Sequence, residues 1–156
     1  MAKFDHLKQI VWRMLYPVFP LLKFSLSVFH AGRQRYHLGW LAPGKSLEDL
    51  KAHLTKQGFG YHFVAWDDSG QVLSWRKFDG FDWQYHLRVF DDGEIRGHYE
   101  KTPESAPIDH FSETGEEPRT PEFLAFFGDL ITHKRHITRL KSDPTAKEVE
   151  SQITFS

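Results

Sequence analysis

The sequence predicts a single α+β domain, with four antiparallel strands in a meander, room for one or two N-terminal strands, and about three helices packed mostly on one face. Three observations lead to this fold class. The chain has 156 residues, enough to bury one core. Four alternating apolar and polar segments follow one another through short Asp/Gly turns. Segments with helical apolar periodicity lie on both sides of them.

The N-terminal third begins with an expected helix over residues 4–15, which ends at Pro17. Its apolar residues recur at helical spacing and should face the core; they are Phe4, Leu7, Ile10, Val11, Met14 and Leu15. Residues 22–28 alternate like a half-buried strand, and "YHLGWL" at 36–41 is a second short strand. Together these two segments could add a hairpin to the sheet.

The N-cap residues predict the start of the next helix. Ser46 is the expected N-cap, and Asp49 three residues later completes a capping-box pattern, with Gly58 as the stop. Four strands then follow, with the sequences "YHFVAW" (61–66), "QVLSWRKF" (71–78), "WQYHLRVF" (83–90) and "EIRGHYEK" (94–101). Their connections contain Gly where a turn needs positive φ.

The C-terminal helix should begin with Thr120 as N-cap and Pro121 in the first helical position. Its expected buried face consists of Leu124, Phe127, Leu130 and Ile131. We place the domain at residues 1–140 and a polar, flexible tail at 141–156.

The apolar pattern also predicts how the strands pair. With a three-residue turn at 91–93, Leu87 faces Gly97 and Tyr85 faces Tyr99, because a slip of one residue would mix apolar and charged side chains on both faces. By the same criterion Trp75 pairs with Tyr85 on one side and with Phe63 on the other.

This register leaves the opposite face of the sheet polar, and we expect that face to be exposed. Its ligand-binding candidates are His62, Trp66, Arg76, Gln84, His86, Arg88, Arg96, His98 and Glu100. Facing arginines are unfavourable unless an anion lies near them. The sequence therefore predicts a binding or interaction protein whose exposed His/Arg-rich face receives an anionic ligand, a nucleic acid or a protein partner, including a second copy in a homodimer. Trp66 would be a stacking platform for bases.

The acidic stretch 102–119 offers an alternative, in which it folds back over the polar face. Glu104, Asp109, Glu113 or Glu116 would then pair with the arginines, with Ile108 and Phe111 as apolar anchors. Charge is distributed unevenly along the chain in a way that fits such internal attraction. Residues 1–45 hold seven basic residues against one acidic, and residues 91–129 hold eleven acidic against three basic.

An enzyme is the minority interpretation. The segment "GWLAPGKS" matches the phosphate-loop pattern with Gly39, Gly44, Lys45 and Ser46, which would bind a nucleotide. The preceding "RQRYHL" is too polar for a buried parallel strand, however, and Trp40 and Pro43 interrupt the backbone donors that a phosphate needs. A strand, a turn and a capped helix explain the match better.

A metal site is the other chemical alternative, although the sequence alone implies no cofactor. His86 and His98 are weak candidates that face each other across neighbouring strands, with His62 or Glu100 one row away. Without cysteine, any site would need imidazole and carboxylate ligands. The same geometry allows general acid and base catalysis by His86 with Glu100.

The apolar stretch 10–29 approaches the length of a membrane span, but two charges and two prolines argue against a continuous transmembrane helix. Trp12 and Phe19 beside basic residues leave peripheral membrane contact open. The lack of cysteine is compatible with a reducing compartment, and we expect a cytoplasmic protein.

Overall fold

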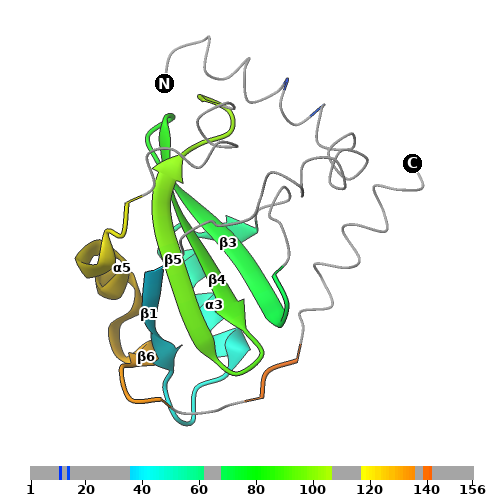
Figure 1. Cartoon of the computed structure of the whole chain (residues 1–156), viewed down its shortest axis with the longest axis vertical. Coiled ribbons are helices and arrows are strands. Elements are labelled where there is room, and N and C mark those ends of the chain that lie inside the picture. Colours follow the sequence, from blue (N-terminus) through cyan, green and yellow to red (C-terminus); the bar gives the residue numbers. More distant parts are fainter. Residues whose placement is uncertain are drawn as a thin grey trace.

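The structure is a computed structural model, which describes Val11, Met14 and residues 36–61, 68–106, 117–135 and 139–141. In these residues the fold is α+β, and the strands form one antiparallel sheet of six in the order β2-β3-β4-β5-β1-β6 (Figure 1). The strands are β1 (Tyr36–Leu41), β2 (Gly60–Tyr61), β3 (Gln71–Asp79), β4 (Trp83–Phe90), β5 (Glu94–Lys101) and β6 (Ile131–Thr132). The described helices are α3 (Leu47–Lys56) and α5 (Thr120–Phe127), the latter followed by the 3₁₀ turn η2 (Gly128–Leu130).

The sheet is wider than the four-stranded meander expected from the sequence. β1 pairs with β5 and so adds the strand foreseen at 36–41, whereas β6 was not foreseen. Ile131, assigned above to the helix, instead begins β6 and pairs with Leu41. The chain leaves its α-helical path at Gly128, the first residue of η2, which has a φ of +57°.

Helix α3 has the N-terminus that the sequence predicts. The Ser46 side chain accepts a hydrogen bond from the Asp49 backbone N–H, and the Asp49 carboxylate accepts one from the Ser46 N–H. This reciprocal cap satisfies two backbone donors that would otherwise lack helical partners. Leu47, Leu50 and Leu54 then lie on one buried face of the helix.

Helix α5 differs from the prediction at its N-terminus. Thr120 is its first helical residue, and the N-cap is Arg119 in a left-handed conformation with a φ of +40° and no side-chain cap. The buried face is Phe123 and Phe127, with Leu130 in η2, whereas Leu124 is only half-buried. The shift of the helix start by one residue does not explain why Leu124 is only half-buried. Helical spacing identifies residues that share a face, but it does not determine which face of the helix packs against the core.

The β4–β5 register is the one predicted: Val89 pairs with Ile95, Leu87 with Gly97, and Tyr85 with Tyr99. The β3–β4 register differs by two residues, because Trp75 pairs with Leu87 and Lys77 with Tyr85. On its other side Trp75 pairs with Tyr61 of β2, so the expected pairing with Phe63 is also wrong. A two-residue slip leaves every side chain on its face, so hydrophobic alternation cannot detect it.

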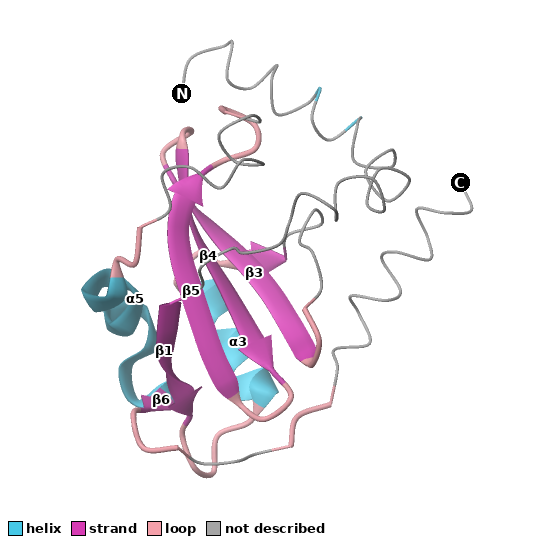
Figure 2. Ribbon diagram, viewed as in Figure 1, coloured by secondary structure: helices cyan, strands magenta, loops and turns pink. Residues whose placement is uncertain are grey.

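The core lies between one face of the sheet and the helices, and Figure 2 shows α3 running behind the strands. Leu50 and Leu54 of α3 belong to one buried cluster with Leu73 and Leu87 of the sheet and Phe123 of α5. Gly97 allows a close approach here, since an added Cβ would lie 2.9 Å from side-chain carbons of both Leu38 and Phe123. The helices thus cover one face, and the other face carries the polar side chains.

Val11 and Met14, expected to face the core, are helical but exposed, at 47% and 74%. Helical periodicity identifies residues that share a face, but it does not identify what covers that face. The remaining residues of the expected 4–15 helix, the strand at 22–28, residues 62–66 and the tail after Lys141 lie outside the described residues. Among the described helices, none has the length and apolar character needed to cross a bilayer.

Candidate functional site

The polar side chains of β3, β4 and β5 share the sheet face opposite the core, and we call this surface the polar face. The strand register arranges them in rows: Ser74, Arg88 and Arg96; Arg76, His86 and His98; and Phe78, Gln84 and Glu100. Directly paired residues project to the same side of a sheet, so each row runs across all three strands. The pairings of His86 with His98 and of Gln84 with Glu100 are those expected, whereas Arg76 lies one row away from its expected place.

The central part of the polar face is buried, which corrects the expectation that these side chains form an exposed surface. Gln84, His86, Arg88, His98 and Glu100 are each at most 2% exposed. The alternation of side chains along a strand shows that one face is polar, but it does not show whether another part of the chain covers that face. We therefore do not place a nucleic-acid or protein interface on these side chains. His62 and Trp66 of the expected surface lie outside the described residues.

Glu104, in the segment after β5, covers the Arg76 end of the face. Its carboxylate pairs with the Arg76 guanidinium through two contacts, of 2.8 Å to Nη2 and 3.1 Å to Nη1. Arg76 also donates to Gln84 Oε1 at 3.1 Å, and Gln84 Nε2 donates to Glu100 Oε1 at 2.8 Å. The result is a continuous chain of polar contacts that ends on Glu100. The alternative in which an acidic residue of 102–119 pairs with these arginines is thus confirmed for Glu104 with Arg76. The other residues named for it lie outside the described residues: Ile108, Asp109, Phe111, Glu113 and Glu116.

Arg88 and Arg96 face each other across β4 and β5, and each is close to its own carboxylate. Arg96 Nη2 donates to Glu94 Oε2 at 2.7 Å, and Arg88 Nη1 lies 3.6 Å from Asp68 Oδ2. These carboxylates lower the cost of placing two like charges side by side. The two environments differ, however, because the Arg96 side chain is 41% exposed and that of Arg88 is 1% exposed.

His86 lies at the centre of the polar face and is held at both ring nitrogens. Its Nε2 is 2.9 Å from Ser74 Oγ, and its Nδ1 is 3.1 Å from Glu100 Oε1. These contacts run diagonally across the three strands, since Ser74 and Glu100 belong to the rows on either side of His86. Both contacts fix the imidazole ring in one orientation.

His98 completes a cluster with His86 and Glu100. The two imidazole rings are 4.9 Å apart between centroids, and His98 Nε2 is 3.2 Å from the same Glu100 Oε1. One ligand atom from each of the three residues lies within 4.8 Å of the others, and all three residues are buried. Two imidazoles and one carboxylate in this arrangement form a set of potential metal ligands.

Burial holds the pKa of His86 well below its usual value near 6.5. The hydrogen bond with Glu100 opposes this shift, whereas the positive charge of Arg88 adds to it. His86 is consequently a neutral imidazole at physiological pH. The neutral form has one ring nitrogen with a free lone pair, which is what a metal ion or a proton transfer requires.

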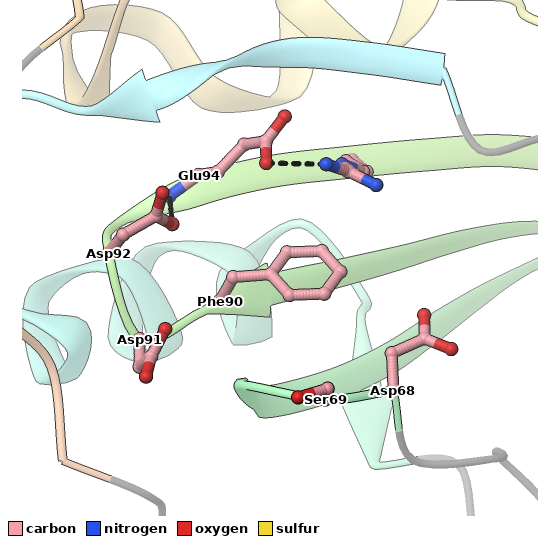
Figure 3. Close-up of a pocket in the computed structure, with 7 residues that line it drawn as sticks. Asp68, Ser69, Phe90, Asp91, Asp92 and Glu94 are labelled. Atoms are coloured by element: carbon pink, nitrogen blue, oxygen red, sulfur yellow. Dashed lines mark hydrogen bonds and ion pairs between the residues drawn. The ribbon is translucent and has the colours of Figure 1, made fainter.

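An open pocket of about 450 Å³ lies at one end of the polar face (Figure 3). It is lined by Asp68, Ser69, Phe90, Asp91, Asp92, Glu94 and Arg96. Asp68 connects it with the interior, because its carboxylate is the one next to Arg88. The pocket therefore reaches the edge of the buried polar network.

The segment that matches the phosphate-loop pattern does not have the structure of a phosphate-binding loop. Gly39 lies in β1, which pairs antiparallel with β5 and β6, whereas a phosphate-binding loop follows a parallel strand. Gly44 belongs to the turn, Lys45 Nζ donates to Asp129 Oδ2 at 2.8 Å, and Ser46 caps α3. A strand, a turn and a capped helix account for all four residues.

Ser74 and Asp68 were not among the sequence-based candidates. Ser74 pairs with Arg88 and contacts His86 diagonally across the strands. Asp68 lies in the turn before β3, where the sequence resembles an ordinary hairpin connection. Both contacts follow from tertiary placement, and no motif marks either residue.

No protein-family model, no curated protein and no solved structure matches the chain. A function is therefore proposed from the geometry of the site alone.

Proposed function

We propose that this chain is a metal-binding protein that holds one divalent transition-metal ion, Zn²⁺ being the ion to test first, through His86, His98 and Glu100. The observation that carries the proposal is the convergence of two buried imidazole nitrogens on one carboxylate oxygen, at 3.1 and 3.2 Å. Zinc bonds of about 2.0–2.2 Å in tetrahedral geometry place neighbouring ligand atoms roughly 3.3–3.5 Å apart. The two distances between an imidazole nitrogen and the carboxylate oxygen are close to this spacing, and all three ligand atoms lie within 4.8 Å of one another.

The contacts around the cluster support the same function. Metal-bound histidines usually donate their second N–H to a partner, and bound carboxylates are themselves hydrogen-bonded. Ser74 Oγ lies next to His86 Nε2, which leaves Nδ1 for the metal, and Gln84 donates to Glu100. Arg76 and Glu104 hold Gln84 in turn. Such outer contacts orient the three ligands before the ion arrives.

The experiment is a thermal-unfolding series on the purified, chelator-treated protein with Zn²⁺, with ATP and Mg²⁺, or with a short single-stranded RNA. A ligand that binds the native state raises its stability, by about 2.7 kcal/mol at one hundred times its Kd. We expect a rise with Zn²⁺ alone. His98→Gln and Glu100→Gln should remove it, whereas Arg96→Gln, on the same strand, should keep it. An equal rise in all variants, or none in the parent protein, would contradict the proposal.

One observation favours a second candidate function, nucleophilic catalysis by Ser74. The contacts from Ser74 Oγ to His86 Nε2 and from His86 Nδ1 to Glu100 have the connectivity of a nucleophile, a base and an orienting carboxylate. In this mechanism Ser74 Oγ would attack an acyl carbonyl, His86 Nε2 would accept the hydroxyl proton, and the leaving group would depart with that proton.

The two candidates need opposite tautomers of His86. Metal binding at Nδ1 places the proton on Nε2, whereas catalysis needs the proton on Nδ1 and a free Nε2. A fluorophosphonate probe distinguishes them by intact mass. Labelling of the metal-free protein that disappears in Ser74→Ala and is blocked by Zn²⁺ would support the catalytic alternative. The burial of Ser74, at 6% exposure, makes metal binding the better-supported function.

A further inference from the structure

We infer that Tyr99 is a site of one-electron oxidation by small inorganic radicals, with Trp83 passing the electron outward and Asp79 accepting the phenolic proton. The inference is independent of the proposed function. Tyr99 and Trp83 pack with Tyr85 on the core side of the sheet, whereas the proposed metal ligands project from the polar face. The two sites are therefore separated by the sheet itself.

The Tyr99 hydroxyl has a carboxylate as its hydrogen-bond acceptor. It donates to Asp79 Oδ2 at 2.9 Å, an ordinary hydrogen-bond distance. A phenol that loses an electron becomes a strong acid, so its oxidation is easiest where a base is already hydrogen-bonded to the hydroxyl. Tyr85 provides the comparison, because it is similarly buried and its hydroxyl forms no hydrogen bond with any of the described residues. The carboxylate therefore distinguishes Tyr99 from its neighbour.

Tyr99 still carries its proton when an oxidant arrives. Burial, and next the hydrogen bond to Asp79, raise the pKa of the Tyr99 hydroxyl above its usual value, and the guanidinium of Arg119 over the ring opposes this shift. At neutral pH the group is therefore an uncharged phenol. The electron and the proton must leave together, because a buried phenol radical cation would be costly. Asp79 is exposed, so it can exchange the proton with solvent.

Trp83 gives the electron a route toward the surface. Its indole ring stacks on the Tyr99 ring, with the centroids 5.0 Å apart and the planes inclined by 2°. The strand register explains this contact, because Tyr99 pairs with Tyr85, and Trp83 precedes Tyr85 by two residues on the same face. Trp83 is half-buried, whereas Tyr99 is 5% exposed. Of the two rings, an oxidant in solution therefore meets the indole first.

The oxidation moves one electron and one proton away from Tyr99 to different acceptors. One electron leaves the Trp83 indole and reduces the neutral oxidant radical to its anion. The Tyr99 ring then donates one electron to the oxidised indole, its phenolic O–H bond breaks, and an O–H bond forms at Asp79 Oδ2. The products are a neutral tyrosyl radical, the original indole, a protonated Asp79 carboxyl group and the reduced oxidant.

The test generates azide radicals by pulse radiolysis in a solution of the full chain and follows the absorption of tryptophanyl and tyrosyl radicals. We expect tyrosyl absorption to replace tryptophanyl absorption in a phase whose rate is independent of protein concentration and lower in heavy water. Tyr99→Phe should remove this phase, and Trp83→Phe should reduce its amplitude. Asp79→Asn keeps a hydrogen-bond acceptor but removes the base, so it should slow the phase at least about tenfold. Tyr85→Phe is the matched control and should behave like the parent protein.

The variants separate the three roles. Persistence of this phase in Tyr99→Phe, or its loss in Tyr85→Phe, would overturn the assignment to Tyr99. An unchanged amplitude in Trp83→Phe would exclude the indole as the route. An unchanged rate in Asp79→Asn, or an equal rate in heavy water, would exclude the coupled proton transfer, and absence of the phase in the parent protein would contradict the whole inference. The experiment uses no metal, so none of these results affects the proposed function.

Discussion

His86 and His98 face each other across β4 and β5, with their ring centroids 4.9 Å apart and one nitrogen of each ring within 3.2 Å of the same Glu100 oxygen. Cross-strand pairing alone brings two imidazoles together. The pleat of β5 adds Glu100, the third proposed ligand, because Glu100 follows His98 by two residues and projects from the same face.

Replacement of Gln84 by methionine tests the outer contacts of the site. Gln84 holds Glu100 Oε1 at 2.8 Å and is itself held by Arg76. We expect Gln84→Met to lower Zn²⁺ affinity about 10–100-fold while all three ligands remain, because outer contacts orient the ligands. Isothermal titration with Zn²⁺ measures this change. Gln57→Met, at the end of α3, is the control and should bind as the parent does. Unchanged affinity in Gln84→Met would show that this contact does not support the site.

Removal of the Glu104 carboxylate should destabilise the fold. Glu104 is 5% exposed and forms two contacts with Arg76, whose side chain is 10% exposed, so Glu104→Ala leaves a largely buried guanidinium without that partner. Breaking a buried pair from one side costs about 3–5 kcal/mol. Urea denaturation measures the loss. Glu117→Ala is the control, because Glu117 pairs with Arg119 at an exposed position and its loss should cost less than about 1 kcal/mol. Equal effects of the two variants would contradict the buried pairing.

A methyl group at Gly97 should overfill the core. Its Cβ would lie 2.9 Å from side-chain carbons of Leu38 and Phe123, which are both at most 1% exposed. Overpacking of this kind typically costs about 1–3 kcal/mol, and we expect that loss for Gly97→Ala in the free energy of unfolding. Gly60→Ala is the matched control, because nothing lies within 4 Å of a Cβ there and its backbone is not in the left-handed region. A neutral Gly97→Ala would contradict this packing.

The raised pKa of the Tyr99 hydroxyl predicts that the folded protein loses stability at alkaline pH. Burial, and next the hydrogen bond from its hydroxyl to Asp79 Oδ2 at 2.9 Å, raise the pKa of Tyr99 above its usual value near 10. Arg119 over the ring opposes the shift, and Tyr85 adds to it. The unfolded tyrosine loses its proton at about pH 10, whereas the folded one keeps it, so this contribution is complete below about pH 10 and falls as the pH rises further.

We therefore expect the urea midpoint to fall between about pH 9 and about pH 11, and Tyr99→Phe to show a smaller fall over that interval. Tyr61→Phe, at a residue that is 40% exposed, should show the same fall as the parent. A fall in Tyr99→Phe as large as that of the parent would exclude Tyr99 as the origin of the alkaline instability.

The sequence predicted local elements well where their signals are local. The Ser46 cap, the bounds of β4 and β5 and the pairing of Tyr85 with Tyr99 follow from capping chemistry, alternation and a short turn. The β3–β4 register was wrong by two residues because that slip preserves both faces. β6 was missed because two residues of strand carry no periodicity.

The sequence predicted which residues come together in the candidate site, but it did not predict that they are buried. His86, His98 and Glu100 were placed together from the register of β4 and β5, which the structure bears out. Their burial, the role of Ser74 and the Arg76–Glu104 pair depend on tertiary contacts between segments distant in sequence. Burial also limits what can reach these side chains, because His86, His98 and Glu100 are each at most 2% exposed and do not form a surface that a macromolecule could contact.

The most direct measurement is a crystal structure of the Zn²⁺-loaded protein with anomalous data collected on both sides of the zinc absorption edge. The account predicts one strong anomalous peak within about 2.0–2.2 Å of a nitrogen of His86, a nitrogen of His98 and an oxygen of Glu100. Full zinc occupancy elsewhere with no peak among these three residues would contradict it.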